Sequence, residues 1–135
     1  MMHFRRLAAA TLLIGSSLAA YDARAVDLNG LWASDTALCD KIFTKKGKQI
    51  AFNPLSDFYG SGFIIEGNRM RGKIARCTIK SRKEDGGTIQ LAAQCTTSIA
   101  PQELDFSLKV IDDNTVGRLY PGVSAMQVDF HRCPP

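Results

Sequence analysis

The sequence predicts a small all-β domain, built as an antiparallel up-and-down barrel of seven or eight strands with at most one short helix. Short runs of alternating apolar and polar residues are separated by turn residues, and these runs follow one another as consecutive hairpins. Four cysteines stand where they can tie the two ends of the domain together. A β-sandwich is the alternative, but stapled ends favour a closed sheet.

The first 25 residues have the three parts of a cleavable signal peptide. Arg5 and Arg6 form a basic start, residues 7–20 are apolar, and the segment ends on the small residues Ala23 and Ala25. The apolar run of about 14 residues is shorter than the roughly 20 that span a bilayer as a helix. We therefore expect removal of residues 1–25, no stable membrane anchor after cleavage, and one disulfide-stapled β domain over residues 26–135, in the periplasm or secreted.

The mature chain is expected to be almost neutral. The full chain has 17 Lys and Arg against 13 Asp and Glu, a formal charge of +4. Removal of residues 1–25 takes away Arg5, Arg6, Arg24 and Asp22, which leaves 14 basic against 12 acidic residues, or +2. This low charge, and the lack of aromatic residues among the basic ones, argue against nucleic acid as a partner.

The predicted strands follow in order along the mature chain. They span residues 28–32, 41–45, 49–52, 60–66, 69–73, 76–83, 88–96, 104–111, 115–120 and 126–132. The only predicted helix is a single turn over residues 34–39, capped by Ser34. In the last three strands the alternation places one set of side chains inward. This set is Leu104, Phe106, Leu108, Val110, Met126, Val128 and Phe130.

Two hairpins can be given a register. A two-residue loop at residues 67–68 places Ile65 opposite Met70. Further along, the set of inward residues shifts by one position, which predicts a β-bulge or bend near Ile74.

The next hairpin brings two cysteines together. A three-residue loop at residues 85–87 pairs Glu84 with Thr88, and the same register places Cys77 directly opposite Cys95. We expect these two cysteines to form a disulfide.

By elimination Cys39 pairs with Cys133, which ties the beginning of the domain to its end. The pairing of Cys39 with Cys77 and of Cys95 with Cys133 is the alternative. Zinc is less favoured because the cysteines are 38, 18 and 38 residues apart and the mature chain has one histidine, His131. We therefore predict neither a metal site nor a cofactor.

The residues Gly30-Leu31-Trp32 resemble the G-x-W motif that opens the first strand of lipocalin-like barrels, a superfamily that includes lipocalins, avidins and small periplasmic inhibitors of bacterial metalloproteases. The resemblance implies that the tryptophan closes the barrel floor and that a basic side chain, from Arg132 or Arg118, packs over it.

The whole chain also resembles a group of small, uncharacterised exported proteins of Gram-negative bacteria, with D-L-N-G-x-W near the mature start, Y-G-S-G-F in the middle and R-C-P near the end. This second resemblance implies a compartment and no chemistry.

A run of basic residues between positions 69 and 83 is a possible anion-binding face. It includes Arg69, Arg71, Lys73, Arg76, Lys80 and Arg82. The alternative is a solvated outer face of the sheet, where such residues discourage edge pairing.

Catalysis is not predicted. The chain has no G-x-S-x-G motif, and Asp129 and His131, two residues apart on one strand face, lack the third group that a catalytic site needs. The leading hypothesis is a non-catalytic periplasmic binding module that engages a protein or an envelope component through its loops and basic face, as an inhibitor in one form. A lipocalin-like carrier of a small apolar ligand is the alternative, and a hydrolytic enzyme comes third. In the carrier hypothesis the cavity is lined by Trp32, Phe52, Phe63, Phe106 and Phe130.

Overall fold

The computed structural model describes residues 25–122 and 126–135, so the predicted signal peptide lies outside the described residues except for Ala25. The strands of the main sheet are β1 (Gly30–Ala33), β4 (Gly62–Glu66), β5 (Arg69–Arg71), β6 (Arg76–Asp85), β7 (Thr88–Thr96), β8 (Pro101–Asp112), β9 (Thr115–Tyr120) and β10 (Met126–Arg132). Between β1 and β4 lie the 3-10 helix η1 (Thr36–Leu38), α1 (Cys39–Ile42), β2 (Phe43–Lys46), β3 (Gln49–Phe52) and the 3-10 helix η2 (Ser56–Phe58).

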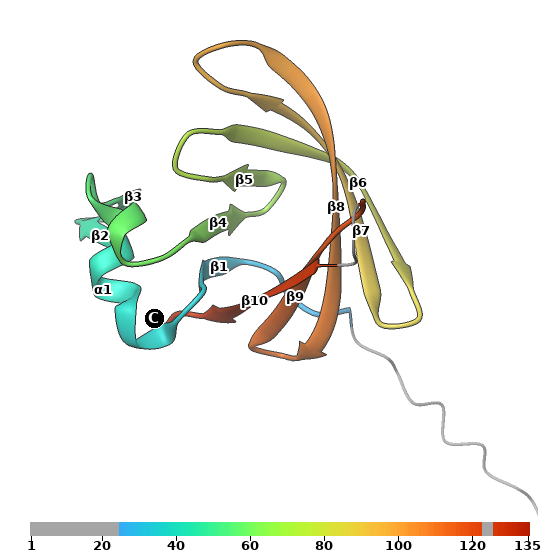
Figure 1. Cartoon of the computed structure of the whole chain (residues 1–135), viewed down its shortest axis with the longest axis horizontal. Helices are drawn as coiled ribbons and strands as arrows, with labels where there is room; N and C mark the ends of the chain where they lie inside the picture. The colour runs from blue at the N-terminus through green and yellow to red at the C-terminus, as the bar shows by residue number, and fades with distance from the viewer. Residues whose placement is uncertain (1–24, 123–125) are drawn as a thin grey trace, which may run out of the picture.

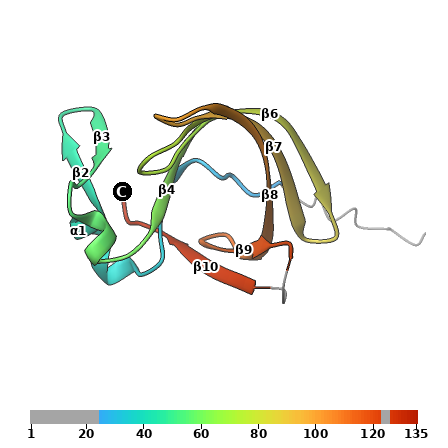
Figure 2. The ribbon, with the colours of Figure 1, turned by 45° about the horizontal axis from the view of Figure 1, so that its top comes forward.

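The main sheet is a closed antiparallel barrel (Figures 1 and 2). Each strand from β4 to β10 pairs with the next in sequence, and β1 closes the barrel by pairing with both β4 and β10. The predicted all-β up-and-down barrel is confirmed, with eight strands.

The predicted hairpin of β2 and β3 exists, but it stands apart from the barrel as a separate two-stranded sheet beside α1 (Figure 1). The hairpin covers the outside of β1 and β4, because these two strands carry apolar residues on both faces. Leu31 and Ile64 are buried on the outer face, in a second cluster beneath α1 and the hairpin. Phe52 belongs to this outer layer, where its ring centroid lies 5.1 Å from that of Phe43, so its expected place inside the barrel is wrong.

The barrel interior is filled by side chains of its own strands. Trp32, fully buried, stacks on Phe63 with ring centroids 6.0 Å apart, and Phe63 meets the edge of Phe130 at 5.1 Å. Most of the predicted inward residues of β8 and β10 are buried or half-buried, but Met126 is 55% exposed because it is the first residue of β10, at one end of the barrel.

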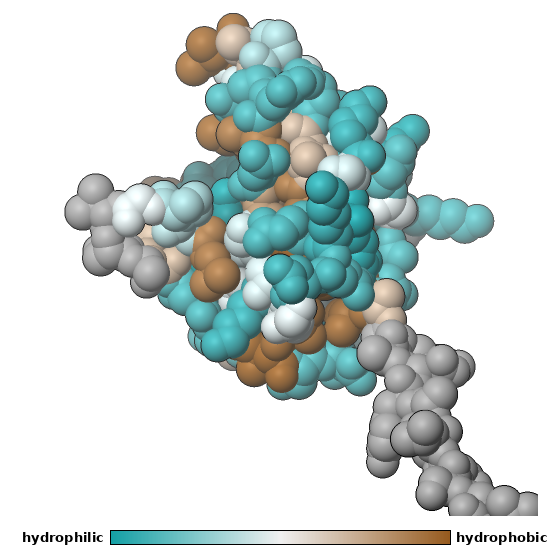
Figure 3. Space-filling view, turned by 90° about the vertical axis from the view of Figure 1, so that its right-hand side faces the viewer, coloured by the Kyte–Doolittle hydropathy of each residue, from teal (hydrophilic) through white to brown (hydrophobic). Residues whose placement is uncertain are grey.

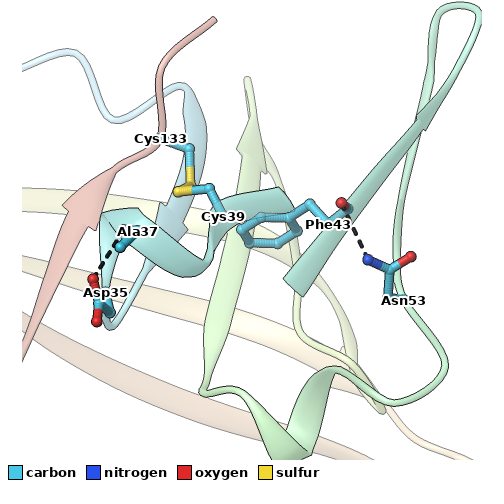
Figure 4. Close-up of a disulfide and its surroundings, with 6 residues drawn as sticks. All are labelled: Asp35, Ala37, Cys39, Phe43, Asn53 and Cys133. Atoms are coloured by element: carbon cyan, nitrogen blue, oxygen red, sulfur yellow. Dashed lines mark hydrogen bonds between the residues drawn. A yellow bond between two sulfur atoms is a disulfide. The ribbon is translucent and has the colours of Figure 1, made fainter. Parts of the chain in front are cut away.

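The expected cap of the helical turn is wrong by one residue. Asp35 caps η1, and its carboxylate accepts a hydrogen bond of 2.9 Å from the backbone N–H of Ala37 (Figure 4). The hydroxyl oxygen of Ser34 accepts instead from the N–H of Ser61, at 3.2 Å. Ser34 therefore joins the end of β1 to the segment before β4.

The bend predicted near Ile74 is a full chain reversal. β5 ends at Arg71, the N–H of Gly72 donates to the carbonyl of Ala75 at 2.9 Å, and β6 returns antiparallel to β5. The predicted one-position shift of the inward-facing residues therefore marks the end of β5 and the start of β6. The basic run is thus folded back on itself.

The β6–β7 hairpin differs from its expected register in two places, and the one-residue shift at the first is cancelled by an opposite shift at the second. Its loop has two residues, Gly86 and Gly87, whose φ angles of +54° and +84° suit a tight hairpin turn, so Asp85 faces Thr88. A bulge between Ile79 and Ser81 then shifts the register back by one residue.

Both predicted disulfides are present. Cys77 lies opposite Cys95 with Cα atoms 4.0 Å apart inside the barrel, and Cys39 of α1 is bonded to Cys133, which follows β10 (Figure 4). The N–H of Cys133 also donates to the carbonyl of Leu31, at 2.7 Å. Two disulfides indicate a protein that folds in an oxidising compartment.

The two disulfides are expected to stabilise the domain unequally. Cys39–Cys133 spans 94 residues and Cys77–Cys95 spans 18. In the chain-entropy model, replacing the first pair by alanine costs about 4.7 kcal/mol and the second about 3 kcal/mol. Urea unfolding of C39A/C133A and C77A/C95A measures both costs. A larger loss from C77A/C95A would contradict loop closure as the source of the difference.

Candidate functional site

One end of the barrel is closed by the side chain of Arg132. Its guanidinium carbon lies 4.3 Å from the ring centroid of Trp32, and its nitrogens donate to the carbonyls of Asp27 at 2.5 Å, of Asp113 at 3.0 Å and of Asn29. The indole N–H of Trp32 donates to the carbonyl of Leu28 at 2.8 Å. We call this the closed end.

Gly30 makes room for this arrangement. A Cβ atom at Gly30 would lie 3.1 Å from Nη1 of Arg132, and its φ of +134° is one that other residues rarely adopt. Arg118 is elsewhere, with its guanidinium 4.8 Å from the ring of Phe106 and 4.5 Å from that of Tyr120. The structure therefore places Arg132, and not Arg118, over the tryptophan.

The opposite end, which we call the loop end, carries the η2 segment, the β5–β6 turn and the β7–β8 turn. These three segments are neighbours around the barrel. Lys73 of the β5–β6 turn donates to the carbonyl of Pro54 at 2.9 Å and pairs with Asp57 in η2. The β5–β6 and β7–β8 turns lie side by side because Arg76 pairs with Thr96 at the adjoining strand ends.

Exposed apolar side chains gather at the loop end. Phe58, Ile74 and Ile99, which we call the apolar rim, are 83%, 81% and 92% exposed and come from the three neighbouring segments. Figure 3 shows hydrophobic atoms at the top of the molecule, at the height of the β7–β8 turn in Figure 1. Among the described residues, six of the seven large exposed apolar side chains belong to this end, and the seventh is Ile111, near the closed end.

The six basic residues expected on one face are divided by the fold. Arg69, Arg76 and Lys80 are exposed. Arg71 and Lys73 bridge the barrel to the segment before it: Arg71 donates to the carbonyl of Ile50 at 3.0 Å and lies 3.6 Å from Glu66.

Arg82 does not belong to the outer face. The bulge in β6 places it opposite the buried residue Leu91, on the inward-facing register. Its guanidinium donates to the carbonyl of Val26 at 2.7 Å and pairs with Glu84 at 2.5 Å. Its expected place on the outer face is therefore wrong.

Three of these cations meet in a hollow at the loop end. This basic hollow has a volume of about 290 Å³ and lies between the end of β3 and the β5–β6 turn. Arg71, Lys73 and Arg76 line it together with Phe52 and Ile74, and no acidic residue is among its lining residues. Arg71 and Arg76 are directly opposite each other in the β5–β6 ladder, an unfavourable arrangement of like charges that the carboxylate of Glu66, 3.6 Å from Arg71, offsets in part.

A second hollow, of about 310 Å³, opens through the side of the barrel at the β6 bulge. The ladder between β5 and β6 ends at Thr78, and the N–H of Ile79 still donates to the carbonyl of Asn68 at 2.6 Å. The residues of β6 after Ile79 have no partner strand on that side. Ile65, Ile79 and Leu91 line the inner part of this side opening, and Lys80 and Arg82 lie at its edge.

Asp129 and His131 do not form a pair. The carboxylate of Asp129 accepts from the side-chain amide of Gln127 at 2.7 Å, and Nδ1 of His131 lies 3.4 Å from the hydroxyl of Thr115. Within residues 25–122 and 126–135, no group of three His, Cys, Asp or Glu side chains is placed to hold a metal ion. Over the same residues, no helix is long and apolar enough to cross a membrane.

Comparison of the chain with protein-family models, with curated proteins and with solved structures finds no match in any of the three. The geometry of the loop end therefore carries the functional argument. The sequence pattern identified the cations of the basic hollow. It did not identify the contribution of Phe52, because nothing in the pattern places the β2–β3 hairpin outside the barrel.

Removal of the Arg132 side chain should destabilise the domain. Arg132→Ala loses the contact with Trp32 and the hydrogen bonds to the backbone on either side, at a cost of about 2 kcal/mol. Arg132→Lys keeps the charge but cannot reach the same carbonyls together, so most of the loss remains. Urea unfolding measures the cost, with the exposed Lys109→Ala as control. Equal stability of R132A and K109A would contradict this role.

Proposed function

We propose that the mature chain is a non-catalytic binding module of the periplasm or the extracellular space, which engages a protein or an envelope component through the loop end of its barrel. The observation that carries the proposal is the gathering of the apolar rim and the basic hollow at one end. Large exposed apolar groups on a soluble surface mark interaction sites when they cluster. Inhibition of an envelope protein is one form that such binding can take.

The side chains of the apolar rim do little to stabilise the fold. Ile99 is 92% and Phe58 83% exposed, so neither contributes appreciable burial to the core. The basic hollow adds polar recognition beside them, because Arg71 and Lys73 are held in place by backbone carbonyls. Positioned cations with neighbouring apolar groups suit a partner that presents an anion beside an apolar surface.

Substitution of the apolar rim should abolish binding to an envelope fraction. The triple variant F58S/I74S/I99S is expected to cosediment with Gram-negative envelope membranes at least about tenfold more weakly than the native mature chain, because it loses three apolar anchors. The matched control is Ile111→Ser, which removes an exposed isoleucine near the closed end. Thermal unfolding should be almost unchanged in all variants, since the substituted side chains are exposed. Equal binding of the triple variant and the control would contradict the proposal, as would no binding of the native chain.

The side opening at the β6 bulge favours a second candidate function, a carrier of a small apolar ligand. Its apolar lining of Ile65, Ile79 and Leu91 leads from the surface towards the core. A carrier should bind an apolar fluorescent probe saturably, and Ile79→Trp, which fills the opening, should remove that binding. Fluorescence titration of both forms tests this. Probe binding that I79W leaves intact would contradict a carrier site at this opening.

A further inference from the structure

We propose that the partner of the loop end is the surface of an anionic phospholipid membrane, with a lipid phosphate in the basic hollow and the apolar rim inserted among the headgroups and upper acyl chains. This inference rests on the proposed function, because it uses the same loop end and names the class of partner.

The chemistry of the basic hollow matches a phosphate that is attached to an apolar body. Arg71, Lys73 and Arg76 line the hollow, and Lys73 is already paired with Asp57. The two guanidinium groups present planar forks of donors that suit phosphate oxygens. Phe52 and Ile74 line the same space, so an anion bound there also meets apolar surface. A free inorganic anion would make no apolar contact with that surface, whereas the glycerol and acyl part of a phospholipid would cover it.

Arg71 and Arg76 have N–H donors that are not used in contacts within the fold and can bind a ligand. Arg71 uses Nη2 for the carbonyl of Ile50 and lies 3.6 Å from Glu66. Within the described part of the chain, Arg76 has no side-chain hydrogen bond or ion pair, and it faces Arg71 across the ladder. Arg69, also exposed, lies two residues before Arg71 on the same face of β5. A membrane phosphate would relieve the repulsion between the two opposed arginines.

The apolar rim fits a membrane better than the centre of a protein interface. Protein interfaces concentrate their apolar contacts in a continuous core from which charged residues are depleted. Phe58 instead lies in η2, and Ile74 and Ile99 lie on the β5–β6 and β7–β8 turns. Lys73 and Arg76 are close to Ile74 in the sequence. Exposed apolar tips on neighbouring segments, with cations close to one of them, suit insertion into the boundary between headgroups and acyl chains, where basic residues remain at the phosphates.

Vesicle binding by the mature chain tests the inference with protein-free lipid. We expect cosedimentation with vesicles of phosphatidylcholine and phosphatidylglycerol to be at least about tenfold stronger than with phosphatidylcholine alone, and to weaken as salt is raised. Arg76→Glu should remove most of this difference. The matched control Lys109→Glu makes the same charge change at an exposed cation on the outer face of β8 and should bind almost as the native chain does.

Insertion of the rim has its own readout. The emission of the tryptophan in I99W should shift to shorter wavelength on addition of the anionic vesicles, and that of I111W should not. The native Trp32 is fully buried and contributes the same background to both variants. Near-ultraviolet circular dichroism and thermal unfolding of each variant establish that the barrel is intact.

Several results would overturn the inference. These are equal binding to the two kinds of vesicle, no binding to either, R76E and K109E binding alike, or an equal emission shift in I99W and I111W. Calorimetric binding of glycerol phosphate without vesicle binding would assign the hollow to a soluble phosphate compound. Binding to envelope membranes that depends on the apolar rim, is lost after protease treatment of those membranes, and is absent with protein-free vesicles would identify a protein partner. That last result would overturn the lipid inference and leave the proposed function standing.

Discussion

The rest of the structure depends on the contact between Arg132 and Trp32 at the closed end. β1 has only four residues, and its ladder with β10 contains only two residue pairs. This short seam closes the barrel. Arg132 extends it by bonding to the carbonyls of Asp27 and Asn29 on one side and of Asp113 on the other. Because these hydrogen bonds join segments that are far apart in sequence, one side chain fixes the start of the domain, the β8–β9 turn and the last strand together.

The outer layer follows from the position of β1. Once β1 is held between β4 and β10, its outward residue Leu31 and the outward Ile64 of β4 form an apolar surface. α1 and the β2–β3 hairpin cover that surface, and Cys39–Cys133 joins α1 to the end of β10. Asn53 completes the layer, since its side-chain amide donates to the carbonyls of Asp40 and Lys41 at 3.1 and 3.0 Å. The same amide donates to the carbonyl of Phe43 at 3.3 Å (Figure 4). The basic hollow lies between this layer and the β5–β6 turn.

Sequence patterns predicted the barrel, both disulfides and most strand positions, because alternation and turn residues act locally. They failed where a choice depends on distant packing. The pairing of Cys77 with Cys95 was predicted from a three-residue loop, whereas the structure reaches it through a two-residue loop and a bulge, and either alone would misalign the cysteines. The basic run was predicted as one outer face, because nothing local distinguishes a bend at Ile74 from a reversal. Of the candidate site, local patterns do not place Phe52 beside the basic hollow or Arg82 on the inward-facing register.

The two ends of the barrel use their cations differently, and this difference bears on function. At the closed end, the nitrogens of Arg132 donate to three backbone carbonyls and, at 3.1 Å, to the side-chain oxygen of Asn114. The guanidinium also packs over Trp32, so its hydrogen-bonding capacity is met within the fold. At the loop end, Arg76 faces Arg71 across a ladder, and the neighbouring turns expose Ile74 and Ile99. A barrel that needed only stability would gain nothing from opposed arginines beside exposed isoleucines. These two features together are the observations on which the proposed binding at the loop end rests.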